Sequence, residues 1–288
     1  MKLQSFCIGQ ETHIGIETGD QVRLLKGVPT LIELIKKLEA VPAAQRSQAI
    51  EQLSGEVVDK AALIATAPIV DPVKDVICVG LNYQAHVNES QSLRITDNKE
   101  DIHTTYFGKR CDYIRGDQEP VIIWSDVDPE MDYEAELAIV IGKRGRGISR
   151  ADARSYVFGY SIGNDLSSRS LQRNHKQWFL GKGSDGYTTM GPCVLVNTDD
   201  QTRQFDIKCS VNGQVRQESN TAMMIKSVED IIYEISRAIT LVPGDIIFTG
   251  TPAGVGGGFQ PPKYLKAGDV VKIEIEGIGT LTNPVVAL

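Results

Sequence analysis

The stretch that decides the fold is MDYEAELAIVIG, at residues 131–142. The apolar run at residues 137–141, closed by a glycine, predicts a short buried strand. Side chains alternate between the two faces of a strand, so Glu134 and Glu136 point the same way. Two carboxylates beside an apolar run repel each other and are costly to desolvate, and a divalent cation such as Mg²⁺, Mn²⁺ or Ca²⁺ removes both costs. The alternative is a strand edge with both glutamates in water, which is the commoner meaning of an E-x-E pattern taken alone.

Composition places the chain among ordinary globular proteins and narrows its partners. It has 288 residues, of which 41% are hydrophobic and 23% charged, with a formal net charge of −7. This charge argues against a nucleic-acid-binding surface and against a polybasic membrane patch. A small anionic ligand stays compatible, because a local site can be positive on an acidic protein.

Cysteine usage and the lack of long apolar runs bear on the compartment. The five cysteines are scattered without a C-x-x-C pair, which is typical of reduced thiols in an intracellular protein. The N-terminal stretch has no apolar leader, and no run approaches transmembrane length. We therefore expect a cytoplasmic protein with no membrane partner.

Two domains are expected, with a boundary near Pro68. Short strands at residues 3–25 and amphipathic helices at 31–39 and 43–53 form a small N-terminal domain, residues 1–70, that carries no chemical motif. Two X-Pro pairs, at 67–68 and 71–72, form a rigid connection. The remainder, residues 71–288, is expected to be the catalytic domain.

A candidate general base follows the strand predicted at residues 76–82. His86 and Glu89 lie three positions apart, which on a helical turn places them on one face. A carboxylate beside a histidine fixes its tautomer and orientation, as a general base requires. The alternative is a solvated helix start with two polar residues. The polar segment that follows, residues 90–104, is either a mobile lid or a plain surface loop.

Further candidates lie at the ends of later strands. Asp165 ends a predicted strand and is a candidate third metal ligand, with Arg169 and Gln172 on the helical turn that follows. Lys182 lies in a Gly-flanked turn from which it reaches a cleft, or else is an ordinary surface lysine. The Gly-rich loop at residues 249–258 is not a P-loop, yet its N–H groups and the Thr251 hydroxyl are suited to hold a carboxylate.

Seven blocks of this sequence, in this order, resemble the fumarylacetoacetate hydrolase family over roughly residues 72–288. The blocks are VGLNYQAHVNE, DYEAELAIVIG, GYSIGNDLSSRSLQ, LGKGSDGY, VNGQVRQ, LVPGDIIFTGTPAGVG and IEGIGTL. The resemblance implies an α+β, β-rich fold, in which a mixed β-sheet roll carries a small N-terminal α/β module. It also implies a homodimer that binds Mg²⁺ (or Mn²⁺) and acts on 2-oxo acids.

The resemblance assigns roles by matching positions. In relatives, three carboxylates bind the metal, a lysine lies beside the developing enolate, polar residues lie near the substrate, and a loop holds its carboxylate. The matching residues are Glu134, Glu136 and Asp165 for the metal, Lys182 for the enolate, Arg169 and Gln172 near the substrate, and Gly250, Thr251 and Pro252 in the loop. Tyr83 is expected to pack beside the base.

Activity in this family is divided among C–C bond hydrolysis, decarboxylation, tautomerisation and hydration. The H-x-x-E spacing of His86 and Glu89 is similar to the dyad of acylpyruvate hydrolases. We therefore expect hydrolysis of an acylpyruvate, such as fumarylpyruvate or acetylpyruvate, to pyruvate and a carboxylate. The alternative enzyme is an oxaloacetate-type decarboxylase or a 2-hydroxy-dienoate isomerase or hydratase with the same metal-enolate site. A catalytically silent metal-binding protein would require a disabled ligand set, and the matching residues are present.

Overall fold

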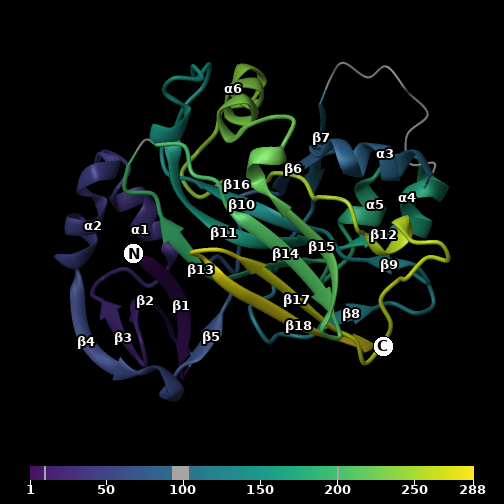
Figure 1. The fold of residues 1–288 in the computed structure, drawn as a ribbon. Coiled ribbons are helices and arrows are strands. Elements are labelled where there is room, and N and C mark those ends of the chain that lie inside the picture. Colours follow the sequence, from purple (N-terminus) through teal and green to yellow (C-terminus); the bar gives the residue numbers. More distant parts are fainter. Residues whose placement is uncertain (10, 93–103, 200) are drawn as a thin grey trace.

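The computed structural model describes residues 1–9, 11–92, 104–199 and 201–288, and the fold is α+β and strand-rich as expected (Figure 1). Across the described part of the chain, one long mixed sheet dominates. In order across this sheet lie β4 (Ser54–Asp59), β3 (Gln21–Leu25), β2 (Glu11–Thr18), β1 (Lys2–Ile8), β13 (Thr188–Val196), β11 (Val157–Asp165), β10 (Ala135–Ile141), β16 (Ile246–Phe248), β6 (Val76–Gly80) and β7 (Thr105–Lys109), with β5 (Ile64–Thr66) also paired to β1.

A second sheet and a short ladder complete the strand content that the structure describes. The second sheet runs in the order β15 (Gln214–Asn220), β14 (Asp206–Val211), β17 (Val270–Ile275), β18 (Gly279–Ala287) and β8 (Val121–Ile123). The ladder pairs β9 (Met131–Asp132) with β12 (Ser167–Ser168). Most pairings are antiparallel, whereas β16 with β6 and β18 with β8 are parallel.

Strand β10 is buried along its whole length because both of its faces are covered. Alternate residues belong to different apolar clusters, one shared with β14 and β17 and the other with helix α1 (Leu31–Lys37). This explains why the sequence of β10 is apolar without alternation. Each such side chain contributes about 1.5–3 kcal/mol on burial. The first cluster includes Leu137, Ile139, Ile141, Ile207 and Ile273, and the second includes Ala138, Val140, Leu34 and Ile35.

The N-terminal strands continue the long sheet, because β1 pairs with β13 in antiparallel fashion. The predicted helices are present as α1 and α2 (Ala43–Glu51), and α2 is fixed to the larger part of the chain by the buried Arg46. Its guanidinium donates to the carbonyl oxygens of Val157, Asn197 and Ser155. The domain boundary near Pro68 stays a prediction.

Three short helices gather at the end of the molecule far from β2 and β3 (Figure 1). They are α3 (Gln84–Ser92), α4 (Arg169–His175) and α5 (Phe179–Lys182), and they carry five of the predicted site residues, His86, Glu89, Arg169, Gln172 and Lys182. Helix α6 (Val228–Ala238) follows Ser227 and begins with a capping box that Ser227 and Asp230 form. Single 3₁₀ turns occur at η1 (Lys60–Ala62), η2 (Ala153–Tyr156), η3 (Thr221–Met223) and η4 (Gly256–Gly258).

Two further expectations from the sequence concern the polar segment at residues 90–104 and membrane-spanning segments. Of the polar segment predicted as a lid or surface loop, residues 93–103 lie outside the described residues. Among the described helices, none combines the length and the apolar character needed to cross a membrane.

Candidate active site

The predicted acids converge because of the register between β10 and β11. Ala135 pairs with Asn164, so the residues just beyond this pair, Glu134 and Asp165, lie opposite each other. The Asp165 amide donates to the Glu134 carbonyl at 3.0 Å, and the Glu134 amide to the Asn164 side chain at 3.0 Å. Glu136 follows on the same face of the strand, and all three acids are buried. Their carboxylate oxygens lie within 4.8 Å of one another.

Two buried lysines surround this cluster. Nζ of Lys182, at the end of α5, lies 2.7 Å from Oε2 of Glu134 and 2.7 Å from Oδ2 of Asp165. Nζ of Lys109, at the end of β7, lies 2.8 Å from the other oxygen of Asp165. Glu136 instead accepts a hydrogen bond at 2.6 Å from the backbone amide of Gly250. The predicted Gly-flanked turn around Lys182 is thus the last turn of a short helix.

The charges of this cluster are unevenly compensated. Burial by itself raises the pKa of Glu134, but Lys182 and Arg169 outweigh burial and bring that pKa down to about 2. Burial raises the pKa of Glu136 well above its ordinary value, and the neighbouring Asp165 and Glu134 raise it further. Burial lowers the pKa of Lys182, yet Asp165 and Glu134 leave it above the usual lysine value. Glu136 is the least compensated acid, so a divalent cation with oxygen ligands fits this donor set.

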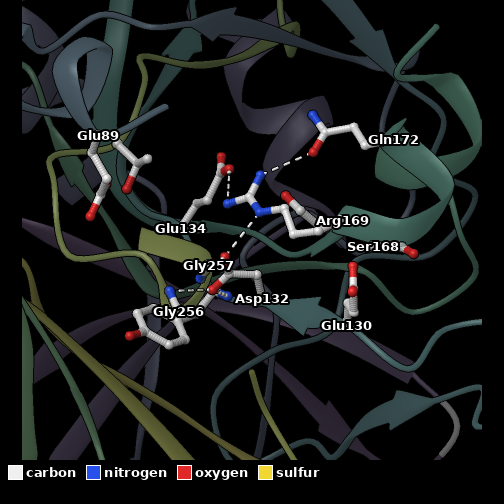
Figure 2. A network of polar contacts seen from close by, with 12 residues as sticks. Glu89, Glu130, Asp132, Glu134, Ser168, Arg169, Gln172, Gly256 and Gly257 are labelled. Atoms are coloured by element: carbon white, nitrogen blue, oxygen red, sulfur yellow. Dashed lines mark hydrogen bonds and ion pairs between the residues drawn. The ribbon is translucent and has the colours of Figure 1, made fainter. Parts of the chain in front are cut away.

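Arg169 is the first residue of α4 and connects Glu134 to a fourth acid, Asp132 (Figure 2). Asp132 was not among the residues predicted from the sequence. Nε of Arg169 donates to Oδ2 of Asp132 at 2.9 Å, and its Nη2 lies 2.8 Å from Oε1 of Glu134. Its Nη1 donates to Oε1 of Gln172, one turn further along α4, at 3.1 Å. The predicted pair of Arg169 and Gln172 therefore lies beside the acids as a connected polar unit.

The predicted base and its carboxylate are in contact on α3. Nδ1 of His86 lies 2.9 Å from Oε2 of Glu89. The other oxygen of Glu89 accepts a hydrogen bond from the Gly254 amide at 3.0 Å, so the dyad is anchored to the Gly-rich loop. The ring of His86 is buried and lines the same cleft as Glu134 and Lys182. Because the carboxylate only accepts, the hydrogen lies on Nδ1 and Nε2 is the basic nitrogen.

The polar groups of the predicted carboxylate loop are engaged within the protein. The Gly250 amide is bonded to Glu136, and the Thr251 hydroxyl donates to the Ala135 carbonyl at 2.9 Å. The side chain of Gln217 donates to the Thr251 hydroxyl and to the Pro252 carbonyl, each at 2.7 Å. A role of this loop in holding a substrate carboxylate stays a prediction.

A cleft of about 350 Å³ of empty space, open to solvent, gathers most of these groups. Predicted residues that line it are His86, Glu134, Glu136, Arg169, Gln172, Lys182 and Thr251. The predicted residues Glu89, Asp165, Gly250 and Pro252 are outside this lining, and the first three bond to residues within it. One wall is apolar and contains Val79, Leu81, Phe107 and Trp178, with the two aromatic rings edge to face at 5.1 Å.

Three neighbours of the site escaped sequence reasoning. Asp132 shares the parity of Glu134 and Glu136, so the strand period of two was a signal for it. Lys109 is buried only because β7 pairs with β6, and its sequence carries no such signal. Trp178 reaches the cleft because Gly80 has no side chain: a Cβ there would lie 2.8 Å from the indole. Tyr83 is buried and is outside the cleft lining, and its packing beside the base stays a prediction.

Comparison with known proteins confirms the family that the sequence resembles. The family described as fumarylacetoacetate (FAA) hydrolase C-terminal matches residues 75–286. Oxaloacetate tautomerase YisK of Bacillus subtilis is 43% identical over 222 residues, 76% of this chain and 72% of that protein. Mitochondrial oxaloacetate tautomerase Fahd2a of Rattus norvegicus is 37% identical over 286 residues, 96% and 88% of the two chains. A solved fumarylacetoacetate hydrolase from psychrophilic Exiguobacterium antarcticum is 35% identical and covers both chains completely, with a TM-score of 0.85.

Proposed function

Because this chain belongs to the fumarylacetoacetate hydrolase family, we propose that it is a metal-dependent enzyme that interconverts the keto and enol forms of an oxaloacetate-type 2-oxo acid. The observation that carries this proposal is the convergence of the three acids with Lys182 and His86 around one cleft, which all of them except Asp165 line. The names of the two tautomerase relatives support the reaction. This preference replaces the sequence-based expectation of acylpyruvate hydrolysis, which these relatives do not specifically support.

Glu134, Glu136 and Asp165 would hold Mg²⁺ or Mn²⁺, both of which favour carboxylate oxygens. When bound, such an ion supplies positive charge that polarises the 2-oxo group and makes the adjacent C–H bond more acidic.

Arg169 and Gln172 orient the substrate. The guanidinium is fixed by Asp132, Glu134 and the Gln172 side chain, and it lies in the cleft wall. Each Nη atom carries two N–H bonds, so a donor remains on each for the carboxylate of a 2-oxo acid. A planar fork of two donors suits a carboxylate better than a point charge does.

Proton transfer falls to His86. Its Nε2 takes a proton from the carbon next to the 2-oxo group, and the electron pair of the C–H bond forms the enolate. Lys182, kept as an ammonium by two carboxylates, stabilises the negative charge that develops on the oxygen. Transfer of the proton from Nε2 to that oxygen gives the enol and returns His86 to its neutral form, and the reverse sequence returns the keto form. Atoms and charge balance without a further reactant.

A second candidate, C–C hydrolysis of acylpyruvates, is favoured by one observation. The His86–Glu89 contact of 2.9 Å also suits activation of a water molecule against an acyl carbonyl. The two reactions share the enolate and differ in whether a C–C bond breaks and pyruvate is released.

The deciding experiment is a substrate panel with added Mg²⁺ or Mn²⁺. Keto–enol conversion of oxaloacetate is followed by the ultraviolet absorbance of the enol, against the metal ion without protein as control. Pyruvate release from acetylpyruvate, fumarylpyruvate and oxaloacetate is measured in parallel by a coupled dehydrogenase. We expect faster enol conversion than in the control and little pyruvate. Rapid pyruvate release from an acylpyruvate with no effect on enol conversion would overturn the tautomerase proposal. Assembly as a homodimer and a cytoplasmic location stay predictions.

A further inference from the structure

Asp132 occupies an unusual position for a buried carboxylate, because it contacts both the site and the Gly-rich loop (Figure 2). Oδ1 accepts hydrogen bonds from the amides of Gly256 at 2.6 Å and Tyr133 at 2.9 Å. Oδ2 accepts from the Gly257 amide at 2.9 Å and from Nε of Arg169 at 2.9 Å. Both oxygens are therefore saturated by donors, and the side chain is fully buried.

These contacts leave Arg169 little freedom. Its side chain is 2% exposed, and its Nε donates to Asp132, which is not one of the acids of the candidate metal site. With Nε fixed, the plane of the guanidinium is set, and the Nη atoms lie toward Glu134 and Gln172. An arginine held at Nε presents its remaining fork in one orientation, which lowers the ordering cost of binding a carboxylate.

The loop that holds Asp132 also holds the base. Gly254 donates to Glu89, and a Cβ placed on Gly258 would lie 2.0 Å from the same carboxylate. A Cβ on Gly256 would lie 2.7 Å from Oδ1 of Asp132, so both carboxylates approach the loop where side chains are missing. One short piece of backbone therefore positions two residues of the site. It binds Asp132, which holds Arg169, and it binds Glu89, which contacts His86.

We propose that Asp132 is the positioning residue of Arg169: it fixes the guanidinium so that both Nη atoms face the carboxylate of the substrate. The substrate class in this inference rests on the proposed function, whereas the placement of the guanidinium does not. Asp132 is separate from the three acids proposed to hold the metal and is not itself expected to touch the substrate.

The kinetic test is a double-mutant cycle of Asp132→Asn and Arg169→Gln. Asp132→Asn alone is expected to lower kcat/KM about 10- to 100-fold, mainly through KM, as for loss of a charged hydrogen bond. In the Arg169→Gln background the same change is expected to cost no more than about twofold, because the group it positions is already gone. A role limited to holding the loop gives equal losses in both backgrounds, and that result overturns the proposal. Asp128→Asn is the matched control, since Asp128 is buried and bonded to Ser168 and Tyr187 instead.

A second readout does not depend on turnover and so separates this inference from the proposed function. The Nε–H resonance of ¹⁵N-labelled Arg169, identified by its loss in Arg169→Gln, is expected to be protected from exchange in the metal-free protein. It is expected to move and lose protection in Asp132→Asn and to persist in Asp128→Asn. An unchanged Arg169 resonance in Asp132→Asn contradicts the proposal whatever the substrate proves to be.

Should Asp132→Asn fail to fold, Gly256→Ala takes its place. Its added Cβ would lie 2.7 Å from Oδ1 of Asp132 and 2.5 Å from the carbonyl oxygen of Lys263, and the charge of Asp132 is kept. The same cycle with Arg169→Gln is then read in the same way, because a shift of the Lys263 backbone alone costs the same in both backgrounds.

Discussion

The ammonium of Lys182 lies 2.7 Å from the carboxylate of Glu134, and both groups are buried. The same nitrogen contacts Asp165, so one lysine neutralises two acids, one just before β10 and the other at the end of β11. A buried ion pair of this kind is costly to break, because the remaining charge has neither water nor a partner. In the metal-free protein Lys182 therefore compensates the charges of both acids, and it also places a positive charge in the cleft.

Lys182→Met is expected to abolish most of the activity, by about 10²- to 10³-fold in kcat, as for loss of a single donor to a developing oxyanion. Because two buried carboxylates each lose one cationic partner, leaving Arg169 at Glu134 and Lys109 at Asp165, the metal-free variant is also expected to unfold at lower temperature, and Mg²⁺ to restore part of the difference. Initial rates and thermal unfolding with and without Mg²⁺ check both effects. Lys266→Met, at an exposed lysine, is the control. Near-normal kcat in Lys182→Met would remove the lysine from the mechanism.

Glu136→Gln is expected to stabilise the metal-free protein at neutral pH and to lose the stabilisation that Mg²⁺ gives the wild type. The amide keeps the acceptor for Gly250 and removes a buried negative charge. A gain of about 1 kcal/mol in the free energy of unfolding corresponds to roughly 2–4 °C in Tm for a protein of this size. Metal at a hundredfold excess over its Kd adds about 2.7 kcal/mol to the free energy of unfolding of the wild type.

The pH dependence of this gain has a definite sign. The pKa of Glu136 is raised in the folded state, so folding binds protons and the wild-type penalty grows as pH rises above the ordinary glutamate value of 4.5. Below that value both states are protonated and the penalty vanishes. The difference in Tm between Glu136→Gln and the metal-free wild type is therefore expected to shrink as pH falls toward 4.5. A difference that grows on acidification is incompatible with this account.

His86→Asn is expected to lower the tautomerisation rate by about 10²- to 10⁴-fold, the usual contribution of a general base. The metal-binding acids are untouched, so the rise in Tm on adding Mg²⁺ is expected to stay as in the wild type. Titration calorimetry with Mg²⁺ provides the control for site integrity. A full rate in His86→Asn would assign proton transfer to another group.

Gly258→Ala is expected to reduce activity by displacing Glu89, since the new Cβ would lie 2.0 Å from its carboxylate oxygen. The loss is expected to be about tenfold or more and to disappear when Glu89 is already replaced by Gln, because neighbouring effects of this kind are not additive. Gly108→Ala is the matched control, as a Cβ at that position meets nothing within 4 Å. Equal losses from Gly258→Ala in both backgrounds would show that the glycine acts independently of the dyad.

Arg46→Met is expected to destabilise the protein by at least about 2 kcal/mol without changing the active site directly. The guanidinium donates to backbone carbonyls at residues 155, 157 and 197, and methionine leaves these acceptors buried. Urea unfolding measures the loss, with the exposed Arg144→Met as control. Comparable stability of the two variants would show that α2 is held by apolar packing alone.

Interactions between residues close in the sequence determined several elements of the fold and part of the candidate site. The apolar run of β10, the strand period that pairs Glu134 with Glu136, the capping box of α6 and the one-turn spacing of His86 and Glu89 all follow from interactions between near neighbours. Seven ordered blocks also identified the family. The preference for hydrolysis rested on the dyad alone, and a dyad that moves protons serves a tautomerase equally well.

Only the tertiary structure decided which distant groups share the site. Asp165 meets Glu134 through strand register, Lys109 is buried because β7 joins the sheet, and Asp132 reaches Arg169 because β9 pairs with β12. The N-terminal strands extend the long sheet through β1 and β13. Hydrogen bonds between strands far apart in the chain set these contacts, and no local spacing encodes such a register.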